Sequence, residues 1–524
     1  IAVLASDQQI AKLRPMKGLF TTVKRYILMD PDENPENNEI SFESVIEAGK
    51  KFIEDNPSAL KERTESVKPD SLANISYTSG TTANPKGIML THGNYVCNAE
   101  QAVEILHGIP PYFRTLLILP WDHSFGHTAG IYTFMKCGAS IASVSMGKTP
   151  MEILRNVPKS IKAINPHLLM SVPALASNFR KSIEAEIEKK GKFTASLFKR
   201  ALKTAYAYNK EGYNKGGRGR LMLSIYDKLI FSKIRQSFSS NMEFFIGGGA
   251  LLDIELQRFF YAIGIPMYQG YGLSEATPII SANSQYVHKL GSSGKPVPNM
   301  DIKIVDGNLQ ELPIGEKGEI IIRGGNVMKG YWKNPEATAE TIVDGWLRTG
   351  DMGYIDKDGF LYVLGRTKSL LISDDGEKFS PEGIEESIVA TSPFIDQCVL
   401  YNNQSPKTFQ RMIYTTALVV PNMAELKKAT PDPEQAALLI EKAINEYRSS
   451  GKHDGLFPHR WIPSAFAVIE EPFSEQNGLV NSTMKIVKHK VYEVYASRIA
   501  SLYTLEGKQA TSPDNLEALK KQFG

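Results

Sequence analysis

The sequence predicts an α/β protein whose large N-terminal domain is built on mostly parallel β-sheets covered by helices. Short apolar runs alternate with helical patterns up to about Ile302, and this alternation is typical of strands joined by helical crossovers. Beyond Ile302 the runs become alternating strands with Gly/Asp turns, which predict a small antiparallel, barrel-like subdomain. A further set of strands and helices follows Arg366 and predicts a small α+β C-terminal domain.

The strands of the large domain are expected in the apolar runs, each followed by a helical segment. In chain order these runs are LANISYT, RTLLILP, HLLMSVP, EFFIGGGA and GIPMYQGYG. Ligands of parallel sheets bind beyond the carboxyl ends of the strands. We therefore expect a ligand near the loops at Thr78, Gly247 and Gly270.

The later elements differ in pattern from the first set. DIKIVDG, GEIIIRG and GFLYVLGR predict the antiparallel strands, and CVLYN, MIYTTALVVP and RWIPSAFAVI predict strands of the C-terminal domain. Helical periodicity marks AALLIEKAINEYR and VKHKVYEVYASRIASLY. With 524 residues the chain exceeds what one hydrophobic core usually serves. We place the large domain at 1–364, a linker at 365–368 and the small domain at 369–524.

Composition favours an ordinary globular protein of a reducing compartment. Apolar residues make up 42% and charged residues 22%, and a net charge of +3 is too small to indicate nucleic acid. Cys97, Cys137 and Cys398 have neither metal-site nor disulfide spacing, which predicts a cytoplasmic protein. No apolar run is long enough to span a membrane. The opening IAVLA predicts a buried strand rather than a signal peptide.

One segment is strongly basic. Residues 180–235 hold 15 Lys/Arg and 5 Asp/Glu, with Phe198, Leu202 and Tyr206 at helical spacing. A basic amphipathic helix can bind anionic lipid, for example at the inner face of a membrane, or an acidic ligand. A solvated helical face is the equally open alternative. Nucleic-acid binding is disfavoured, because no stacking motifs are interleaved with the charges.

The stretch YTSGTTANPKG, Tyr77 to Gly87, has the composition of a polyphosphate-binding loop. Small residues let the backbone approach a ligand, while hydroxyls and glycine N–H groups supply donors and Lys86 a cation. It is not a Walker loop, because Pro85 precedes the lysine and Gly87 follows it. Any short piece of the stretch is more typical of a Ser/Thr/Gly surface loop, so the phosphate interpretation needs support from the rest of the chain.

Four further stretches carry candidate site residues. MYQGYGLSEATP holds Tyr271 and Glu275, and WLRTGDMGYIDKDGFLYVLGRTKSLL holds Asp351 and Arg366. DDGEKFSPEGIEESI predicts a helix start with Ser380 as N-cap and Pro381 at the first helical position. EQNGLVNSTMKIVK places Lys485 after a polar loop. Taken singly, Glu275, Asp351 and Arg366 are more typical of solvated turns, Tyr271 of a core and Lys485 of a surface.

Together, in this order and spacing, the five stretches resemble the adenylate-forming superfamily of acyl-CoA synthetases, acyl-adenylating domains and luciferases. The resemblance covers nearly the whole chain. It is strongest to the AMP-forming long-chain fatty acid-CoA ligases, because of the basic helical insertion at about 180–235 and the ending PFSEQNGLVNSTMKIVKHKV. Members of this family have a further stretch before the point where this chain begins, so the resemblance implies an N-terminally truncated large domain.

The resemblance implies a two-step reaction with ATP, Mg²⁺ and coenzyme A. A fatty acid carboxylate attacks the α-phosphate of ATP and releases pyrophosphate, and the CoA thiol then displaces AMP from the acyl-AMP. Such phosphoryl chemistry depends mainly on positioning and charge stabilisation. The neighbouring alternative is an enzyme that delivers the acyl group to an acyl carrier protein. A catalytically silent relative is disfavoured, because Lys485 and Glu275 are both present.

Site roles follow from the resemblance position by position. It implies that Glu275 binds Mg²⁺, that Tyr271 stacks on adenine, that Asp351 binds the ribose hydroxyls and that Arg366 contacts the ribose or α-phosphate. It implies Lys485, Glu275 and Thr78 as catalytic residues. The other nucleotide-binding positions that it implies are Ser79, Gly80, Thr81, Thr82 and Lys86 at the phosphates, Gly248, Gly249 and Ala250 opposite the adenine, and Gly272 and Ser274 in the turn after Tyr271.

The resemblance also implies a mobile C-terminal domain. Lys368 falls at the hinge position of the family, where a few dihedrals absorb a rotation between the two half-reactions. One pose delivers Lys485, and the other opens a CoA channel beside residues 376–379. His123 matches a family position near the acyl group, but His127 is close by, and the two without a third ligand do not predict a metal site.

A few positions depart from the family pattern. Ala83 stands at a usual glycine, which affects loop mobility if that position needs a positive φ. Ser274 replaces a common threonine and keeps the hydroxyl, and Leu251 and Lys488 replace a usual proline and arginine.

Overall fold

The computed structural model describes residues 2–4, 7–30, 34–78, 85–145, 150–213, 215–216, 219–373, 378–402, 414–481 and 486–524. The chain folds as two compact units, Ile1–Ser71 and Leu72–Gly524. None of the helices in the described ranges combines the length and apolar character needed to cross a bilayer. The three cysteines are free thiols, as their spacing predicts.

The first unit is a small parallel sheet with helices. Its strands pair in the order β1-β2-β3, and its core is formed by Leu4, Ile10, Tyr26 and Leu28. The buried Glu39 carboxylate forms ion pairs with Arg14 Nη2 at 2.7 Å and with Lys17 Nζ at 2.6 Å. The elements are β1 (Ala2–Leu4), α1 (Asp7–Leu13), η1 (Arg14–Leu19), β2 (Tyr26–Leu28), β3 (Glu39–Ser41), α2 (Phe42–Asp55) and α3 (Ala59–Ser66).

A mixed sheet in the order β12-β11-β10-β9-β8-β6-β7 forms the centre of the second unit. The strands from β7 to β10 are parallel, as the sequence predicts, whereas β11 and β12 join antiparallel at one edge. The strands are β6 (Arg114–Leu117), β7 (Ser140–Ser143), β8 (Leu168–Ser171), β9 (Phe244–Gly247), β10 (Met267–Gly272), β11 (Ile279–Ala282) and β12 (Lys295–Pro296).

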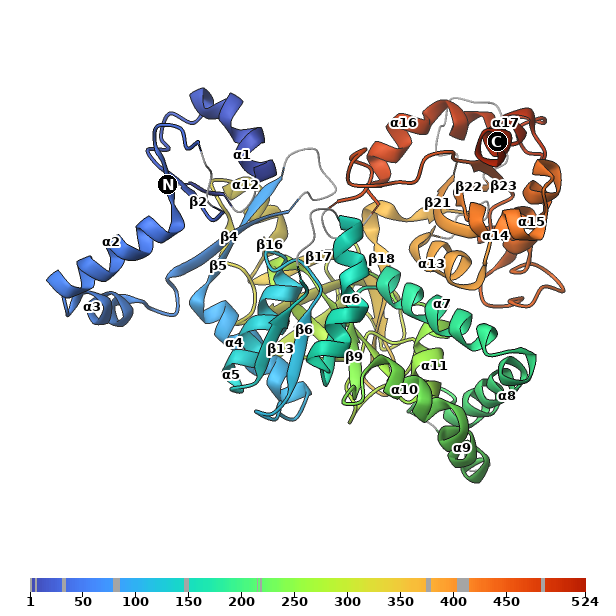
Figure 1. Ribbon diagram of the computed structural model, residues 1–524, viewed down its shortest axis with the longest axis horizontal. Coiled ribbons are helices and arrows are strands. Elements are labelled where there is room, and N and C mark those ends of the chain that lie inside the picture. Colours follow the sequence, from blue (N-terminus) through green and yellow to red (C-terminus); the bar gives the residue numbers. More distant parts are fainter. Residues whose placement is uncertain are drawn as a thin grey trace. The chain divides into compact units, whose positions relative to one another are not determined.

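Alternate side chains of these strands fill two different cores, because successive residues of a strand point to opposite faces. In β9, Phe245 packs into one core while Phe244 packs into the other. In β10, Met267 and Tyr268 divide in the same way. Helices must therefore cover both faces, and Figure 1 shows α4 and α5 on one side of the strands and α6, α10 and α11 on the other.

The covering helices come from the connections between the strands. On the first face lie α4 (His92–Ile105), η2 (Phe125–Tyr132) and α5 (Thr133–Lys136). Thr91 and Asn94 form a capping box at the start of α4. On the second face lie α6 (Pro150–Ile164), α7 (Pro173–Lys189), α8 (Lys192–Asn209), α9 (Arg220–Tyr226), η3 (Asp227–Phe231), α10 (Ser232–Phe238) and α11 (Ile254–Ile263).

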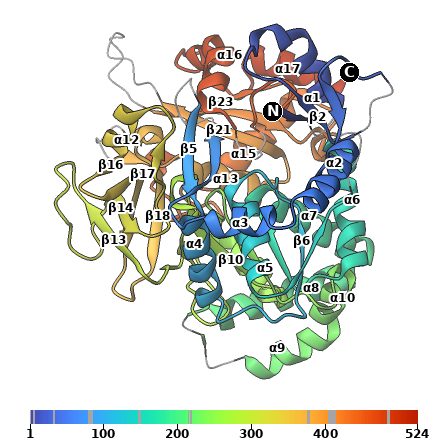
Figure 2. The same cartoon turned by 90° about the vertical axis from the view of Figure 1, so that its left-hand side faces the viewer.

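Two smaller antiparallel sheets follow in the same unit. One has the order β13-β14-β17-β16 with β18 paired to β17, as predicted for the sequence after Ile302, and Figure 2 shows these strands side by side. The other has the order β15-β5-β4. The elements are β4 (Leu72–Thr78), β5 (Lys86–Thr91), β13 (Met300–Val305), β14 (Gly318–Gly324), β15 (Gly330–Tyr331), α12 (Pro335–Thr341), β16 (Ile342–Val343), β17 (Trp346–Ile355) and β18 (Leu361–Arg366).

The position of β4 corrects one expectation. LANISYT is a strand, but it pairs antiparallel with β5 instead of joining the parallel sheet. The run identifies a strand, but its partner is β5, the next strand in the sequence. Residues 79–84, between the two strands, lie outside the described residues. Gly270, expected in a loop, lies within β10.

The segment from Thr367 onward has its own cores. Its sheet runs in the order β21-β22-β23 and its helices pack on both faces. Pro381 caps its first helix and Glu382 begins it, one residue later than predicted, while the Ser380 hydroxyl still accepts from Glu382 N at 3.4 Å. The elements are η5 (Thr367–Ser369), β19 (Leu371–Ile372), β20 (Lys378–Phe379), α13 (Glu382–Thr391), β21 (Ile395–Asn402), β22 (Thr415–Pro421), α14 (Met423–Ala429), α15 (Pro433–Asn445), η6 (His459–Trp461), β23 (Ala465–Val468), α16 (Lys488–Ser501) and α17 (Pro513–Phe523).

Candidate active site

Tyr271, Asp351 and Arg366 form one hydrogen-bonded group. Tyr271 comes from the end of β10, and Asp351 and Arg366 stand opposite each other on β17 and β18. The Tyr271 hydroxyl donates to Asp351 Oδ2 at 2.7 Å, and Arg366 Nε lies 3.4 Å from Asp351 Oδ1. Burial, and then the adjacent Asp351 charge, raise the pKa of Tyr271 well above its usual range, so the hydroxyl stays a donor.

Glu275 anchors a second group with Tyr331 and Lys86. The short helix η4 (Ser274–Ala276) carries Glu275, and the Tyr331 hydroxyl of β15 donates to Glu275 Oε1 at 3.0 Å. The Lys86 ammonium lies 5.0 Å from the centre of the Tyr331 ring, within cation–π range. Burial, followed by the Glu275 charge, raises the pKa of Tyr331, which keeps this hydroxyl protonated as well.

The two groups are neighbours around Arg366. Burial tends to lower the pKa of this guanidinium, but the facing charges of Asp351 and Glu275 outweigh it and raise the pKa. The Arg366 side chain is still 44% exposed, whereas that of Asp351 is 8% exposed. A cation is therefore held beside two carboxylates and remains accessible to an anionic ligand.

The loop after β9 brings Gly248, Gly249 and Ala250 next to β10. Gln269 of β10 donates to the Ala250 carbonyl at 3.2 Å and accepts from Leu252 N at 2.7 Å, so it fixes the loop from both sides. A Cβ on Gly248 would lie 3.0 Å from the Phe125 ring, and Gly249 has φ +83. The positive φ of Gly249 therefore favours glycine, and Gly248 leaves room for the Phe125 ring.

Gly272 and Ser274 shape the turn between Tyr271 and Glu275. A Cβ on Gly272 would collide with the Pro278 carbonyl, so only glycine permits this approach of the two segments. The buried Ser274 hydroxyl lies 3.1 Å from the Ser124 hydroxyl. The hydroxyl that replaces the family's threonine is thus used in holding the turn.

The histidines of the LPWDHSFGHTAG stretch belong to η2 and the turn before it. His123 Nδ1 accepts from Phe125 N at 3.3 Å, and His127 Nε2 lies 2.7 Å from the Tyr132 hydroxyl. His127 also stacks on Tyr95 at 5.5 Å. No cluster of three or more His, Cys, Asp or Glu suited to a metal occurs in the part of the chain that the structure describes.

A single carboxylate nevertheless fits Mg²⁺ bound together with a nucleotide. Mg²⁺ is usually held by one or two carboxylates plus substrate phosphates and water, rather than by a cage of protein ligands. Glu275 supplies a hard oxygen donor whose orientation is fixed by Tyr331. The donor set thus suits a cation that arrives with ATP.

Several predicted site residues lie outside the described residues: Ser79, Gly80, Thr81, Thr82, Lys485 and the first half of the stretch 376–379. The backbones of Thr78 and Lys368 are described, at the end of β4 and within η5. Thr78 therefore lies on the strand that pairs with Lys86.

Two residues of the site were not predicted from the sequence. Tyr331 lies in a two-residue strand, and its role depends on a contact with Glu275, 56 positions away. Gln269 carried a signal that could have revealed it, because a polar side chain inside the apolar run GIPMYQGYG must find buried partners.

Comparison with protein families gives a match to the family model described as AMP-binding enzyme over residues 2–332. The long-chain-fatty-acid–CoA ligase FadD15 of Mycobacterium bovis is 29% identical over 477 residues, which cover 89% of this chain and 74% of that protein. The long-chain-fatty-acid–[acyl-carrier-protein] ligase AEE15 of Arabidopsis thaliana is 28% identical over 485 residues, which cover 84% of this chain and 63% of that protein.

Among solved structures, the anthranilate CoA ligase AuaEII in complex with anthranoyl-AMP has a similar fold. The TM-score is 0.66 at 20% identity, over 95% of this chain and 79% of that one. At this identity the likeness concerns the fold alone. It agrees with the mixed central sheet and the smaller sheets described above.

Proposed function

The chain belongs to the AMP-binding enzyme family, and on that premise we propose that it is an AMP-forming long-chain fatty acid-CoA ligase. The coarser activity, acyl activation by adenylate formation, follows from the family and its relatives. The observation that carries the finer proposal is the similarity to FadD15 over 89% of this chain. The geometry around Glu275 and Asp351 supports it with chemistry suited to ATP.

In this proposal the group formed by Tyr271, Asp351 and Arg366 binds the nucleoside. The Asp351 carboxylate accepts hydroxyl donors and is already oriented by two neighbours, so it suits the ribose diol. The partly exposed Arg366 would contact the ribose or the α-phosphate. The Tyr271 ring would stack on adenine, and the loop at Gly248, held by Gln269, would form the wall opposite.

The second group would act on the polyphosphate. Lys86, near the Tyr331 ring, and the donors of residues 78–82 would bind the β- and γ-phosphates. Glu275 would hold Mg²⁺, which neutralises phosphate charge as pyrophosphate leaves. Most of the rate enhancement then comes from positioning the carboxylate in line with the α-phosphate and from stabilising developing charge.

Lys485 would supply the remaining cation, from the C-terminal segment. We propose that residues 365–368 act as the hinge that alternates the C-terminal domain, 369–524, between adenylation and thioester formation. The described backbone there consists of the last two residues of β18 and the first two of η5, so the proposed hinge spans the junction of these two elements.

A second acceptor is considered because of a specific observation. AEE15, a ligase for acyl carrier protein by its name, matches over 84% of this chain at nearly the same identity as FadD15. Both acceptors present a phosphopantetheine thiol to the acyl-AMP. The alternative is therefore the same first half-reaction followed by transfer to a carrier protein.

Pyrophosphate release by the purified protein tests the proposal. ATP, Mg²⁺ and fatty acids of increasing chain length are supplied without an acceptor, with CoA, or with phosphopantetheinylated carrier protein. We expect release that requires a long-chain acid, and acyl-CoA as product. Glu275→Gln serves as the control for contaminating activity. A thioester formed with the carrier alone would select the second acceptor, and absence of fatty acid-dependent release would contradict the proposal.

A further inference from the structure

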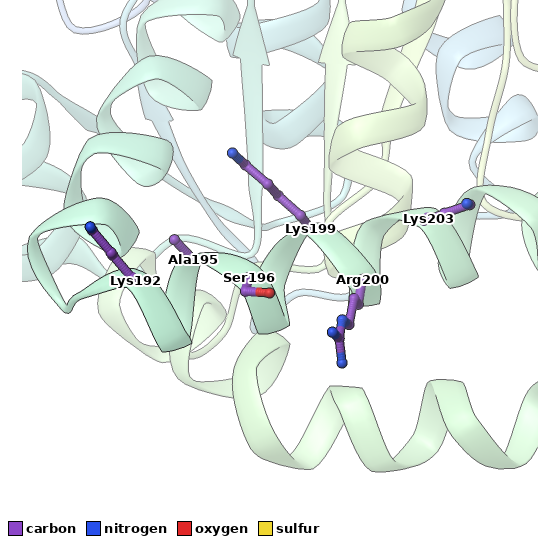
Figure 3. A pocket seen from close by; sticks show the side chains of 6 residues that line it. All are labelled: Lys192, Ala195, Ser196, Lys199, Arg200 and Lys203. Carbon is purple, nitrogen blue, oxygen red and sulfur yellow. The ribbon is translucent and has the colours of Figure 1, made fainter.

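Helix α8 has a basic outer face. Phe198, Ala201 and Ala205 point into the core, and the side chains on the opposite side form an open hollow. Figure 3 shows the long basic side chains of this face extending away from the ribbon. The lining residues are Lys192, Ala195, Ser196, Lys199, Arg200 and Lys203.

The charges of this face are not balanced locally. The helix sequence KFTASLFKRALKTAYAYN contains no acidic residue. Within the described part of the chain, none of Lys192, Lys199, Arg200 and Lys203 takes part in a salt bridge. Four cations are therefore available on one side of α8 for an anionic partner.

The next helix exposes an apolar stripe. In α9 and η3, Leu223, Tyr226, Ile230 and Phe231 pack into the core shared with α8. Leu221, Ile225 and Leu229 follow one another four positions apart and so share one face, and Met222 is adjacent. The exposed fractions are 77% for Leu221, 46% for Met222, 42% for Ile225 and 50% for Leu229.

Basic residues border this stripe as well. Arg220 and Lys228 are exposed at either end of it, and Phe193, 83% exposed, lies in the first turn of α8. Helix α9 packs against α8, and both views of the molecule place α9 at the outer edge of the second unit. Large apolar side chains bordered by Lys and Arg are the pattern of helices that lie in a membrane interface, with the apolar groups in the acyl boundary and the cations at phosphates.

The charge of the whole chain favours an anionic surface as the partner. Residues 180–235 hold 15 Lys/Arg against 5 Asp/Glu, whereas the complete chain has a net charge of only +3. The rest of the chain is therefore net acidic, and anionic lipid would repel it. Electrostatic attraction would orient the protein with residues 180–235 toward such a surface. A bilayer also accommodates four apolar side chains without a matching pocket.

We propose that α8, α9 and η3 form a peripheral docking surface for anionic phospholipid bilayers. Leu221, Met222, Ile225 and Leu229 enter the interface, and Lys192, Lys199, Arg200 and Lys203 contact lipid phosphates. This surface lies outside the residues assigned to nucleotide and metal. Docking concerns where the protein works and does not depend on the acyl specificity proposed above.

Co-sedimentation with extruded vesicles, without substrates, tests the surface. We expect the protein to bind phosphatidylcholine vesicles containing about one third phosphatidylglycerol, and to be released at about 0.5 M salt. The triple variant Lys199→Glu, Arg200→Glu and Lys203→Glu should have a vesicle–water partition coefficient at least about tenfold lower than that of the wild type. Its matched control, Lys317→Glu, Lys357→Glu and Lys520→Glu, makes the same charge change on exposed lysines elsewhere and should bind almost as wild type.

The apolar stripe is tested by a second pair of variants. Leu221→Gln, Ile225→Gln and Leu229→Gln together should also weaken binding about tenfold, because apolar insertion is lost while the charges remain. The control changes the exposed Ile314, Leu438 and Leu505 to Gln. Unchanged circular dichroism and melting show that both triple variants fold. Failure of the wild type to bind anionic vesicles at low salt, or equal binding by variants and controls, would overturn the proposal. So would a stripe variant that dissociates a dimer without losing vesicle binding.

Discussion

At the scale of single residues, removal of the hydrogen bond from Tyr331 to Glu275 tests the proposed Mg²⁺ position most directly. We expect Tyr331→Phe to lower kcat/KM for ATP–pyrophosphate exchange about tenfold, because hydrogen bonds to charged groups contribute ~1.5–3 kcal/mol. The loss should be accompanied by a higher Mg²⁺ requirement, since the carboxylate is less well oriented. Exchange rates at a series of Mg²⁺ concentrations measure both effects.

Two further variants provide a stronger change and a control for comparison with Tyr331→Phe. Glu275→Gln removes the carboxylate charge and should cost more than Tyr331→Phe at every Mg²⁺ concentration. Tyr354→Phe, whose ring stacks on Tyr362 at 4.8 Å, is the matched tyrosine control and should leave exchange unchanged. An unaltered Mg²⁺ requirement in Tyr331→Phe would argue that the tyrosine has only a packing role.

Single residues also show what the sequence could and could not predict. Tyr271, Glu275, Asp351 and Arg366 were predicted by the order of the motifs, and the structure brings them together. Their roles toward a ligand remain predictions. Tyr331 was missed because its role depends on a hydrogen bond to Glu275, 56 positions away in the sequence. Neither the neighbouring residues nor the two-residue strand that carries Tyr331 indicates this contact.

At the scale of elements, apolar runs predicted strands better than they predicted pairing. The runs at β6, β8, β9 and β10 became neighbouring parallel strands, because both faces of such strands are buried and the runs are nearly continuous. The run LANISYT differs, because Asn74, Ser76 and Thr78 alternate with apolar residues, and β4 pairs antiparallel with β5 in a separate sheet. The alternation was a signal against a place in the parallel sheet, although the apolar content alone did not show which strand would be the partner.

We expect His167, just before β8, to make the stability of the protein sensitive to acid. Its Nδ1 accepts from Arg114 N at 3.1 Å, and its ring stacks on Phe113 at 4.7 Å. Burial, and then the Arg114 charge, lower the pKa of His167. The unfolded chain therefore takes up a proton first as pH falls below about 6.5, so stability present above that pH is lost on acidification.

Urea unfolding at pH 7.5 and at lower pH values measures this loss. His167→Asn places an amide oxygen near the position of Nδ1 and cannot titrate in this range, so it should show a smaller drop in the unfolding midpoint than wild type. His489→Asn, at an exposed position, is the control and should follow the wild type. A drop in His167→Asn as large as that of wild type would assign the acid sensitivity to other groups.

At the scale of the whole molecule, the two steps of the proposed reaction require different environments around the same acyl group. Adenylation needs a cation against the carboxylate and α-phosphate, and thioester formation needs room for a thiol. The C-terminal segment has its own cores, with Ile384, Ile440 and Leu519 fully buried among its own residues. We propose that it turns as a body, with dihedral changes confined to 365–368.

This proposal predicts that two substitutions separate the half-reactions. Lys485→Ala should slow adenylation at least ~10²-fold, about 3 kcal/mol of transition-state stabilisation, while acyl-AMP supplied from outside is still converted to acyl-CoA. Lys368→Pro fixes one φ of the proposed hinge at about −65° and should impair acyl transfer to CoA more than adenylation.

Pyrophosphate exchange reports the first step, and acyl-CoA formed from supplied acyl-AMP reports the second. Lys357→Pro, at an exposed turn before β18, controls for a general effect of proline on the unit. Equal losses in both steps for Lys485→Ala would contradict a role of the lysine that is specific to adenylation. Matched losses for Lys368→Pro would mean that the two half-reactions share one arrangement of the chain, because a restricted hinge can only discriminate between steps that require different domain positions.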